Sequence, residues 1–229
     1  MKLLIISDIH GNKEALDAVL DIPHDDIICL GDLVDYGPSP RECIEQIQER
    51  GIHTIKGNHD NAVASKVDCG CGYKYKHLSI ATREYTWKCL DDTHMDFLRK
   101  LPMQIEKEIA GSKFHFTHGS PRSMYEYIKP ETPEEEVREM IKDLDVDFVV
   151  IGHSHIPFVK QVGDVNIINP GSVGQPRDGD ARASCAIFDT EKNSAQIIRC
   201  DYDMGSTCDL IRENMPHSDE LIGILQRGY

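Results

Sequence analysis

Residues 2–11 read KLLIISDIHG and join a short apolar run to two polar side chains of the kinds that bind cations. The run from Leu3 to Ile6 is short and rich in isoleucine and leucine, as is typical of a buried strand. Asp8 and His10 follow it directly, and Gly11 permits a sharp turn after them. This stretch therefore predicts a strand whose carboxyl end carries ligand side chains.

Similar apolar runs recur along the chain and alternate with segments of helical spacing. The strand-like runs lie at residues 2–7, 26–30, 52–56, 113–117, 147–151, 166–169, 184–189 and 195–200. Apolar residues at helical spacing lie within residues 15–20, 43–47, 78–89 and 137–144. Alternation of this kind indicates an α/β fold. The last third of the chain is richer in strands, and the tail from Asp201 onward is expected to be peripheral.

Two helix starts carry the same local chemistry. Ser39-Pro40-Arg41-Glu42 and Thr132-Pro133-Glu134-Glu135 each place a hydroxyl before a proline and a glutamate three residues after the hydroxyl. This order predicts a capping box at both places, with proline at the first helical position.

The segment from Asn61 to His77 is the least regular part of the chain, and a small cap or loop insertion is expected at about residues 61–100. Cys69 and Cys71, with His77 nearby, have the residue types of a soft-metal site. Because no second cysteine pair accompanies them, a solvated loop is favoured over a metal site. The basic aromatic stretch that ends at His77 is a further candidate for substrate contact.

Length, composition and charge fit one domain spanning residues 1–229. The chain has 229 residues, of which 40% are hydrophobic, and a formal net charge of −14 from 25 basic and 39 acidic residues. A chain of this length builds its core without disulfides, so the eight cysteines are expected to be reduced and mostly buried. The longest apolar runs have four residues, too short for a membrane span or a signal peptide, so a cytoplasmic protein is expected. The negative charge disfavours nucleic acid and anionic membranes as partners.

Polar side chains follow five of the predicted strands at the point where each strand ends. Ligands of α/β sheets bind beyond the carboxyl ends of the strands, so these five groups are expected to converge there. A single histidine at such a place is usually a satisfied core residue, but five strand ends in succession indicate a site. Seven side chains are candidate metal ligands: Asp8, His10, Asp32, Asn58, His118, His153 and His155.

The candidate ligands offer nitrogen and oxygen but no thiolate. This set suits Mn²⁺, Zn²⁺ or iron better than Ca²⁺ or a thiolate-bound metal. Seven ligands exceed the need of one tetrahedral ion, so the sequence predicts two divalent ions that share one carboxylate. Mn²⁺ is the expected metal, with iron, Zn²⁺ and Ni²⁺ as alternatives.

Five ordered motifs resemble those of the calcineurin-like metallophosphoesterase family: Asp8-x-His10, Gly31-Asp32-x-x-Asp35, Gly57-Asn58-His59-Asp60, His118-Gly119 and Gly152-His153-x-His155. The similarity runs from residue 8 to residue 155. The segments 169–173 and 175–177 resemble the small prokaryotic branch, which includes phosphodiesterases and diadenosine tetraphosphatase-like proteins. The resemblance implies an α/β fold in four layers, an αββα sandwich of two mixed sheets flanked by helices.

The resemblance also implies a role for each candidate residue. One ion would be held by Asp8, His10 and His155, the other by Asn58, His118 and His153, with Asp32 bridging the two. His59 corresponds to the general acid of the family and Asp35 to the carboxylate that orients it, whereas Asp60 is expected to point elsewhere.

One departure from the family concerns phosphate binding. Its protein phosphatases have Arg-Gly after the aspartate that matches Asp35, whereas this chain has Tyr36-Gly37. Arg177 is the candidate to bind substrate phosphate instead, and a surface salt bridge is the alternative interpretation of that residue.

The resemblance and the ligand chemistry together predict an enzyme that hydrolyses phosphodiester or phosphomonoester bonds of a small, nucleotide-like substrate. Two divalent ions would lower the pKa of a bridging water from 15.7 to roughly 7, and the hydroxide would attack phosphorus. The alternatives are a non-catalytic protein-interaction module, a role that a retromer subunit has on this fold, and a serine/threonine protein phosphatase. A nuclease is disfavoured by the net charge. The oligomeric state stays open, with a homodimer among the alternatives.

Overall fold

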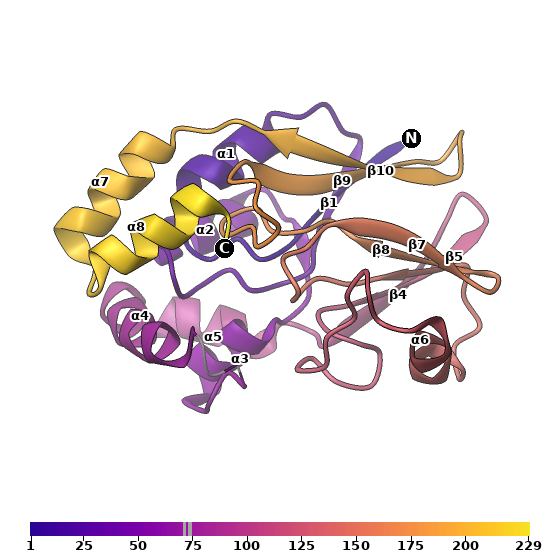
Figure 1. Cartoon of the computed structure of the whole chain (residues 1–229), viewed down its shortest axis with the longest axis horizontal. Helices are drawn as coiled ribbons and strands as arrows, with labels where there is room; N and C mark the ends of the chain where they lie inside the picture. Colours follow the sequence, from indigo (N-terminus) through magenta and orange to yellow (C-terminus); the bar gives the residue numbers. More distant parts are fainter. Residues whose placement is uncertain (71, 73–74) are drawn as a thin grey trace.

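The computed structural model describes residues 1–70, 72 and 75–229, and it confirms the predicted α/β fold (Figure 1). Two mixed five-stranded sheets pack face to face between layers of helices. The first sheet has the order β10-β9-β1-β2-β3: Ser194–Cys200, Ala183–Asp189, Lys2–Ile6, Asp26–Cys29 and His53–Thr54. The second has the order β4-β5-β6-β8-β7: Gln104–Ile109, Ser112–Thr117, Phe148–Val150, Val165–Asn169 and Phe158–Val162.

Eight helices surround the sheets within the described residues (Figure 1). Their bounds are α1 Lys13–Leu20, α2 Pro40–Glu49, α3 Asn58–Ser65, α4 Lys76–Cys89, α5 Asp92–Lys100, α6 Glu134–Ile141, α7 Met204–Asn214 and α8 Ser218–Arg227. In the view of Figure 1, α7 and α8 lie above α4 at one end of the molecule, and α6 lies against the second sheet at the other end. Among the described residues, no helix is long and apolar enough to cross a lipid bilayer.

The strand β1 is apolar at every buried position because both of its faces are covered. Leu3 and Ile5 belong to the cluster between the two sheets, together with phenylalanines of the second sheet. Leu4 and Ile6 point to the other side and pack with residues of α1 and α2. β1 and β2 run parallel, so the residues that follow them leave the sheet at the same edge.

Several elements differ from the sequence-based expectation. β4 and β7 were not predicted, because both are edge strands with partly exposed, polar sequences such as QIEKEI. α3, α4 and α5 lie largely within residues 61–100, where the sequence predicted a small cap or loop insertion, and of these helices only α4 was predicted. The tail from Asp201 onward forms α7 and α8, whose apolar side chains bury Tyr36. This helix pair lies at one end of the molecule, and it also packs against Tyr36, which lies beside the candidate site.

Neither predicted capping box forms. Ser39 precedes α2, but its hydroxyl makes no capping hydrogen bond. α6 begins after Pro133 rather than Thr132, and the Thr132 hydroxyl accepts a hydrogen bond from the Lys129 backbone N–H instead. In both cases proline close to the helix start already removes one unpaired donor, which weakens the need for a side-chain cap.

The segment before α4 is not simply a solvated loop. Cys69 is buried, and its Sγ lies 3.0 Å from the Ser79 hydroxyl. Cys71 and the residues Tyr73 and Lys74 of the basic aromatic stretch lie outside the described residues, so the Cys-x-Cys alternative stays untested. Of the seven cysteines that the structure describes, five are buried, as predicted from the scattered positions in apolar segments.

Candidate active site

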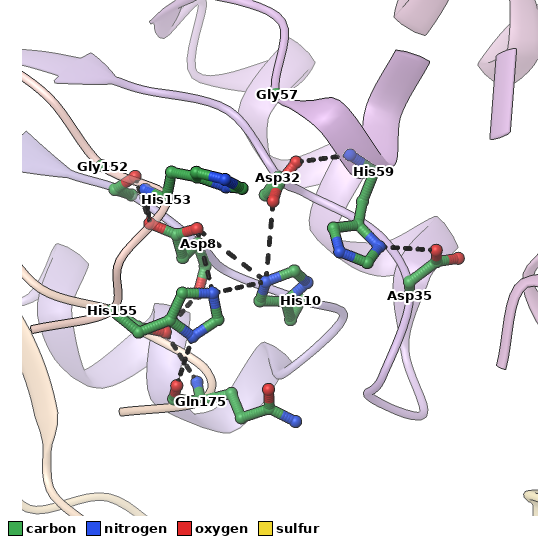
Figure 2. A network of polar contacts seen from close by, with 12 residues as sticks. Asp8, His10, Asp32, Asp35, Gly57, His59, Gly152, His153, His155 and Gln175 are labelled. Carbon is green, nitrogen blue, oxygen red and sulfur yellow. Dashed lines mark hydrogen bonds and ion pairs between the residues drawn. The ribbon is translucent and has the colours of Figure 1, made fainter. Parts of the chain in front are cut away.

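The polar side chains that follow the strands converge at one edge of the sandwich (Figure 2). Two groups of three have ligand atoms within 4.8 Å of one another, and all six residues are buried. The first group is Asp8, His10 and His155, and the second is Asp32, His118 and His153. Each group combines one carboxylate with two imidazoles. The members of each group come from distant parts of the chain.

Asp32 lies between the two groups. Its Oδ2 is 3.2 Å from Nε2 of His118 in its own group and 3.8 Å from Nε2 of His10 in the other. In the first group, Nε2 of His155 lies 3.2 Å from both Oδ1 of Asp8 and Nε2 of His10. The structure thus places one carboxylate oxygen between the two candidate ion sites, where a bridging ligand would have to lie.

Asn58, the seventh predicted ligand, joins the second group from the first turn of α3. Its Oδ1 lies 2.9 Å from Nε2 of His118. Its Nδ2 donates to the backbone carbonyl of Cys69 at 2.8 Å, which fixes the amide with oxygen toward the site. All seven predicted ligands are therefore brought together.

Backbone carbonyls anchor three of the histidines on the side away from the site. Nδ1 of His10 donates to the Val34 carbonyl at 2.8 Å, and Nδ1 of His155 donates to the Gln175 carbonyl at 2.5 Å. Nδ1 of His118 likewise donates to a backbone carbonyl, that of Leu30, at 2.7 Å. Such contacts fix the tautomer and leave the Nε2 lone pair for a metal.

The carboxylates are anchored in the same one-sided way. Oδ2 of Asp8 accepts from the Ser7 hydroxyl at 2.6 Å and from the His153 backbone N–H at 3.1 Å. Oδ1 of Asp32 accepts from the His59 backbone N–H at 2.8 Å. The other oxygen of each carboxylate is buried and, among the described residues, accepts no hydrogen bond; the same is true of Nε2 of His153.

These unpaired atoms fit divalent metal ions. A buried polar atom without a partner costs about 1–3 kcal/mol, and more when it is charged. Here three such atoms face the centres of the two groups, and all are nitrogen or oxygen donors of the kinds that Mn²⁺, Zn²⁺ and iron accept. The structure therefore contains two candidate groups of donors for divalent metal ions.

The buried carboxylates and imidazoles of the two groups shift one another's pKa values in opposite directions. Burial opposes a charge on His118, but the negative charge of Asp32 raises its pKa to about 9. Burial and the neighbouring His118 lower the pKa of His153 to about 3. Burial also lowers the pKa of His10 well below its ordinary value.

The backbone at the site is held in an unusual conformation. Asp8, His10 and Asp32 have φ of 55°, 47° and 57°, and His153 and His155 have φ of 63° and 57°. Left-handed backbone costs a non-glycine residue on the order of 1–3 kcal/mol and persists only where the surroundings enforce it. Five of the seven candidate ligands thus carry strain, as is typical of functional sites.

Gly57 illustrates how closely the chain packs behind Asp32. A Cβ at residue 57 would lie 2.0 Å from Oδ1 of Asp32, so only glycine fits. Asp60 holds the backbone around Asp32 and Gly57. Its carboxylate accepts hydrogen bonds from the backbone N–H groups of Asp32, Leu33 and Gly57 at 2.7, 2.8 and 3.0 Å. It supports the loop and points away from the His59 ring.

His59 and Asp35 form a hydrogen-bonded pair beside the two groups (Figure 2). Nδ1 of His59 lies 2.8 Å from Oδ2 of Asp35, and the ring centroid of His59 lies 5.1 Å from that of His10. Burial opposes a charge on His59, but the nearby Asp32 and the hydrogen bond to Asp35 raise its pKa. The carboxylate that contacts the His59 ring is therefore Asp35, as the resemblance implied, and not Asp60.

Arg177 lies near the first group and is held by aromatic rings. Its guanidinium carbon is 4.6 Å from the ring centroid of Tyr75 and 5.7 Å from that of Tyr36, and its Nη2 donates to Gln175 Oε1 at 2.7 Å. Among the described residues no carboxylate pairs with it. The alternative of a surface salt bridge is therefore not supported.

Three further residues at the site were not predicted. Tyr127 stacks on His153 with ring centroids 4.0 Å apart, and the Tyr36 ring lies 4.9 Å from both His10 and His59. Nε of Arg83 donates to Oδ2 of Asp35 at 3.2 Å. Tyr127 and Arg83 stand in segments without a recognisable motif, so no local signal in the sequence could identify them.

Comparisons with known proteins find a matching family and several relatives of this chain. Residues 1–193 match the model of the calcineurin-like phosphoesterase superfamily domain. The chain is 37% identical to an uncharacterized protein of Methanocaldococcus jannaschii, over 93% of this chain and 92% of that protein. It is 27% identical to the phosphodiesterase YfcE of Escherichia coli, over 83% of this chain and 89% of that one.

A solved structure extends the similarity to the whole chain. The crystal structure of a metallophosphoesterase from Sphaerobacter thermophilus superposes with a TM-score of 0.83 at 32% identity, over 100% of this chain and 99% of the other. The superposition agrees with the two mixed sheets and their flanking helices described above. The matched domain model and this whole-chain likeness lead to one conclusion: the protein belongs to the calcineurin-like phosphoesterase superfamily.

Proposed function

We propose that this protein is a hydrolase with two divalent metal ions that cleaves phosphodiester or phosphomonoester bonds of a small, nucleotide-like substrate. The observation that carries the proposal is the position of Asp32, whose free oxygen lies between two buried donor groups next to the His59–Asp35 pair. Membership of the superfamily supports hydrolysis of phosphate esters in general.

The residues that would hold the two ions follow from the donor groups. Asp8, His10 and His155 would hold one and Asn58, His118 and His153 the other, with Asp32 shared; Mn²⁺ is the proposed metal. Bound there, divalent ions supply charge that polarises the phosphoryl group and acidify a water to a pKa of roughly 7.

His59 would donate a proton to the leaving group. Its Nδ1 is engaged by Asp35, so Nε2 is the nitrogen that can carry a proton to an oxygen in the site. The raised pKa favours the protonated imidazole that this role requires. Asp35 keeps the ring oriented and stabilises its positive charge, so the pair acts as one proton donor.

Arg177 and the rings around it would bind the rest of the substrate. Since no carboxylate among the described residues pairs with it, this arginine is a suitable donor for phosphate oxygens. The half-buried ring of Tyr75 next to it is a candidate contact for a planar group such as a nucleobase. A long nucleic acid is disfavoured as a substrate by the net charge of −14.

Activity toward a panel of esters tests the proposed function. The protein loaded with Mn²⁺ is expected to hydrolyse bis-p-nitrophenyl phosphate, p-nitrophenyl phosphate, cyclic nucleotides or dinucleoside polyphosphates, and the metal-chelated protein is expected to be inactive. The preferred ester identifies the substrate class. Absence of turnover with Mn²⁺, Zn²⁺, Fe²⁺ and Ni²⁺ alike would contradict the proposal and favour a protein-interaction module.

Replacing Arg177 by methionine tests the phosphate contact. A hydrogen bond to a charged group is worth about 1.5–3 kcal/mol, so kcat/KM for a nucleotide ester should fall by roughly 10- to 100-fold, mainly through KM. Steady-state kinetics measure the change. Arg182→Met is the control, because Arg182 lies in the same loop but pairs with Asp180. Equal kinetics for Arg177→Met and the control would exclude the contact.

A further inference from the structure

Arg83 is a buried arginine of α4 that contacts the proton-donating pair but none of the candidate metal ligands. Its side chain is 7% exposed, and its Nε donates to Oδ2 of Asp35 at 3.2 Å. That oxygen is the one bonded to Nδ1 of His59. The other oxygen of Asp35 is buried and, within the described part of the chain, has no hydrogen-bond partner. Two donors thus hold this carboxylate, and one of them is Arg83.

The remaining nitrogens of Arg83 tie it to the helical region that covers the site. Nη2 donates to the Ser79 hydroxyl at 2.7 Å, and Nη1 donates to the Val67 carbonyl at 3.3 Å. A guanidinium is planar and rigid, so three contacts in different directions fix its position. Its place relative to Asp35 is therefore set by where α4 and residue 67 lie.

The same region reaches the metal-ligand groups by a separate route. Ser79 Oγ lies 3.0 Å from Cys69 Sγ, and the Cys69 carbonyl accepts from Nδ2 of Asn58 at 2.8 Å. α4 is itself docked on the body of the protein by Tyr85, whose hydroxyl donates to the Pro38 carbonyl at 2.8 Å. The position of α4 therefore affects both the Asp35–His59 pair and the metal-ligand groups.

Asp35 needs this support because its backbone does not hold it alone. It has φ of 65° and is followed by Tyr36 at 63°, so two consecutive residues adopt the left-handed conformation. A buried carboxylate left with one donor would lose much of what fixes its rotamer. A rotation of Asp35 would in turn release the His59 ring, whose Nδ1 the carboxylate orients.

We propose that Arg83 is a positioning residue, which fixes the Asp35–His59 pair to helix α4 so that docking of this helix aligns the proton donor. The consequence for catalysis rests on the proposed function of His59, whereas the structural part does not.

The first test compares Arg83→Met with Arg41→Met. Arg41 also ties α4 to its surroundings, because its Nε donates to the Cys89 carbonyl at 2.8 Å, but it does not contact Asp35. We expect Arg83→Met to lower hydrolysis of an alkyl or nucleoside ester by on the order of 10-fold or more, with a clearly smaller effect on a nitrophenyl ester. Arg41→Met should lower both equally or neither. Arg83→Lys should recover part of the loss, since an ammonium can pair with Asp35 without making all three contacts.

The second test does not depend on activity. In the Zn²⁺-loaded protein, the Nδ1 proton of His59 should be protected from exchange with water, as followed by ¹⁵N-edited NMR with His59→Asn for assignment. Exchange should become on the order of 10-fold faster in Arg83→Met and stay unchanged in Arg41→Met. Unchanged protection in folded Arg83→Met would overturn the positioning role. Lost protection with unchanged ester selectivity would support it while contradicting the proton-donor role of His59.

Discussion

Asp32→Asn is expected to cost the protein both metal ions and nearly all of its activity. The exchange keeps the size of the side chain and an oxygen for the His59 backbone N–H, but it removes the negative charge between the two donor groups. Loss of a supporting residue around a metal commonly lowers affinity 10- to 100-fold, and a shared ligand should matter at least as much to each ion. Because bound ions supply several kcal/mol to the transition state, hydrolysis should fall by on the order of 10³-fold.

Elemental analysis after Mn²⁺ loading measures this effect. Two ions per chain are expected in the unaltered protein, and His153→Asn, which removes a ligand of one group, should lose less metal than Asp32→Asn. Asp147→Asn is the control for the exchange itself, since this carboxylate accepts the Lys113 backbone N–H away from the site. Retention of two ions by Asp32→Asn would show that Asp32 does not bridge them.

The convergence of the ligands could be predicted because each one follows a strand. The carboxyl ends of parallel strands such as β1 and β2 meet at one edge, so Asp8 and Asp32 had to lie close once the strands were recognised. The apolar run of Leu3 to Ile6 could be recognised as a strand because both faces of β1 are buried, so that every residue in the run is apolar. The local sequence pattern and the geometry of parallel strands together were sufficient to predict β1 and the convergence of the ligands.

What could not be predicted depends on contacts between segments that carry no pattern of their own. Arg83 is one of several charged residues on α4, and only the docking of that helix brings it to Asp35. Tyr127 reaches His153 from an irregular segment after β5. α7 and α8 have amphipathic sequences, but nothing in them indicates that they would bury Tyr36. Such contacts are set by tertiary packing, which spacing along the chain does not encode.

His59→Asn is expected to act on one class of substrate far more than on another. An alkoxide of high pKa departs only when it is protonated, whereas nitrophenolate departs largely unaided. Without the imidazole, hydrolysis of an alkyl or nucleoside ester should therefore slow by roughly 10²- to 10⁴-fold, and that of a nitrophenyl ester much less. Metal content should stay close to that of the unaltered protein, since the His59 side chain bonds Asp35 and belongs to neither donor group.

The control for this variant is His115→Asn. His115 is also buried and also lies near a carboxylate, with Nδ1 3.3 Å from Glu106 Oε1. It lies within β5, however, and does not contact the His59–Asp35 pair. Its replacement should leave the ratio of the two rates unchanged even if stability falls. If His59→Asn slowed both esters equally while retaining its metals, proton donation would have to come from elsewhere. The pairing with Asp35 would then serve only to hold the first turn of α3, which carries Asn58, and metal-assisted attack alone would account for the activity.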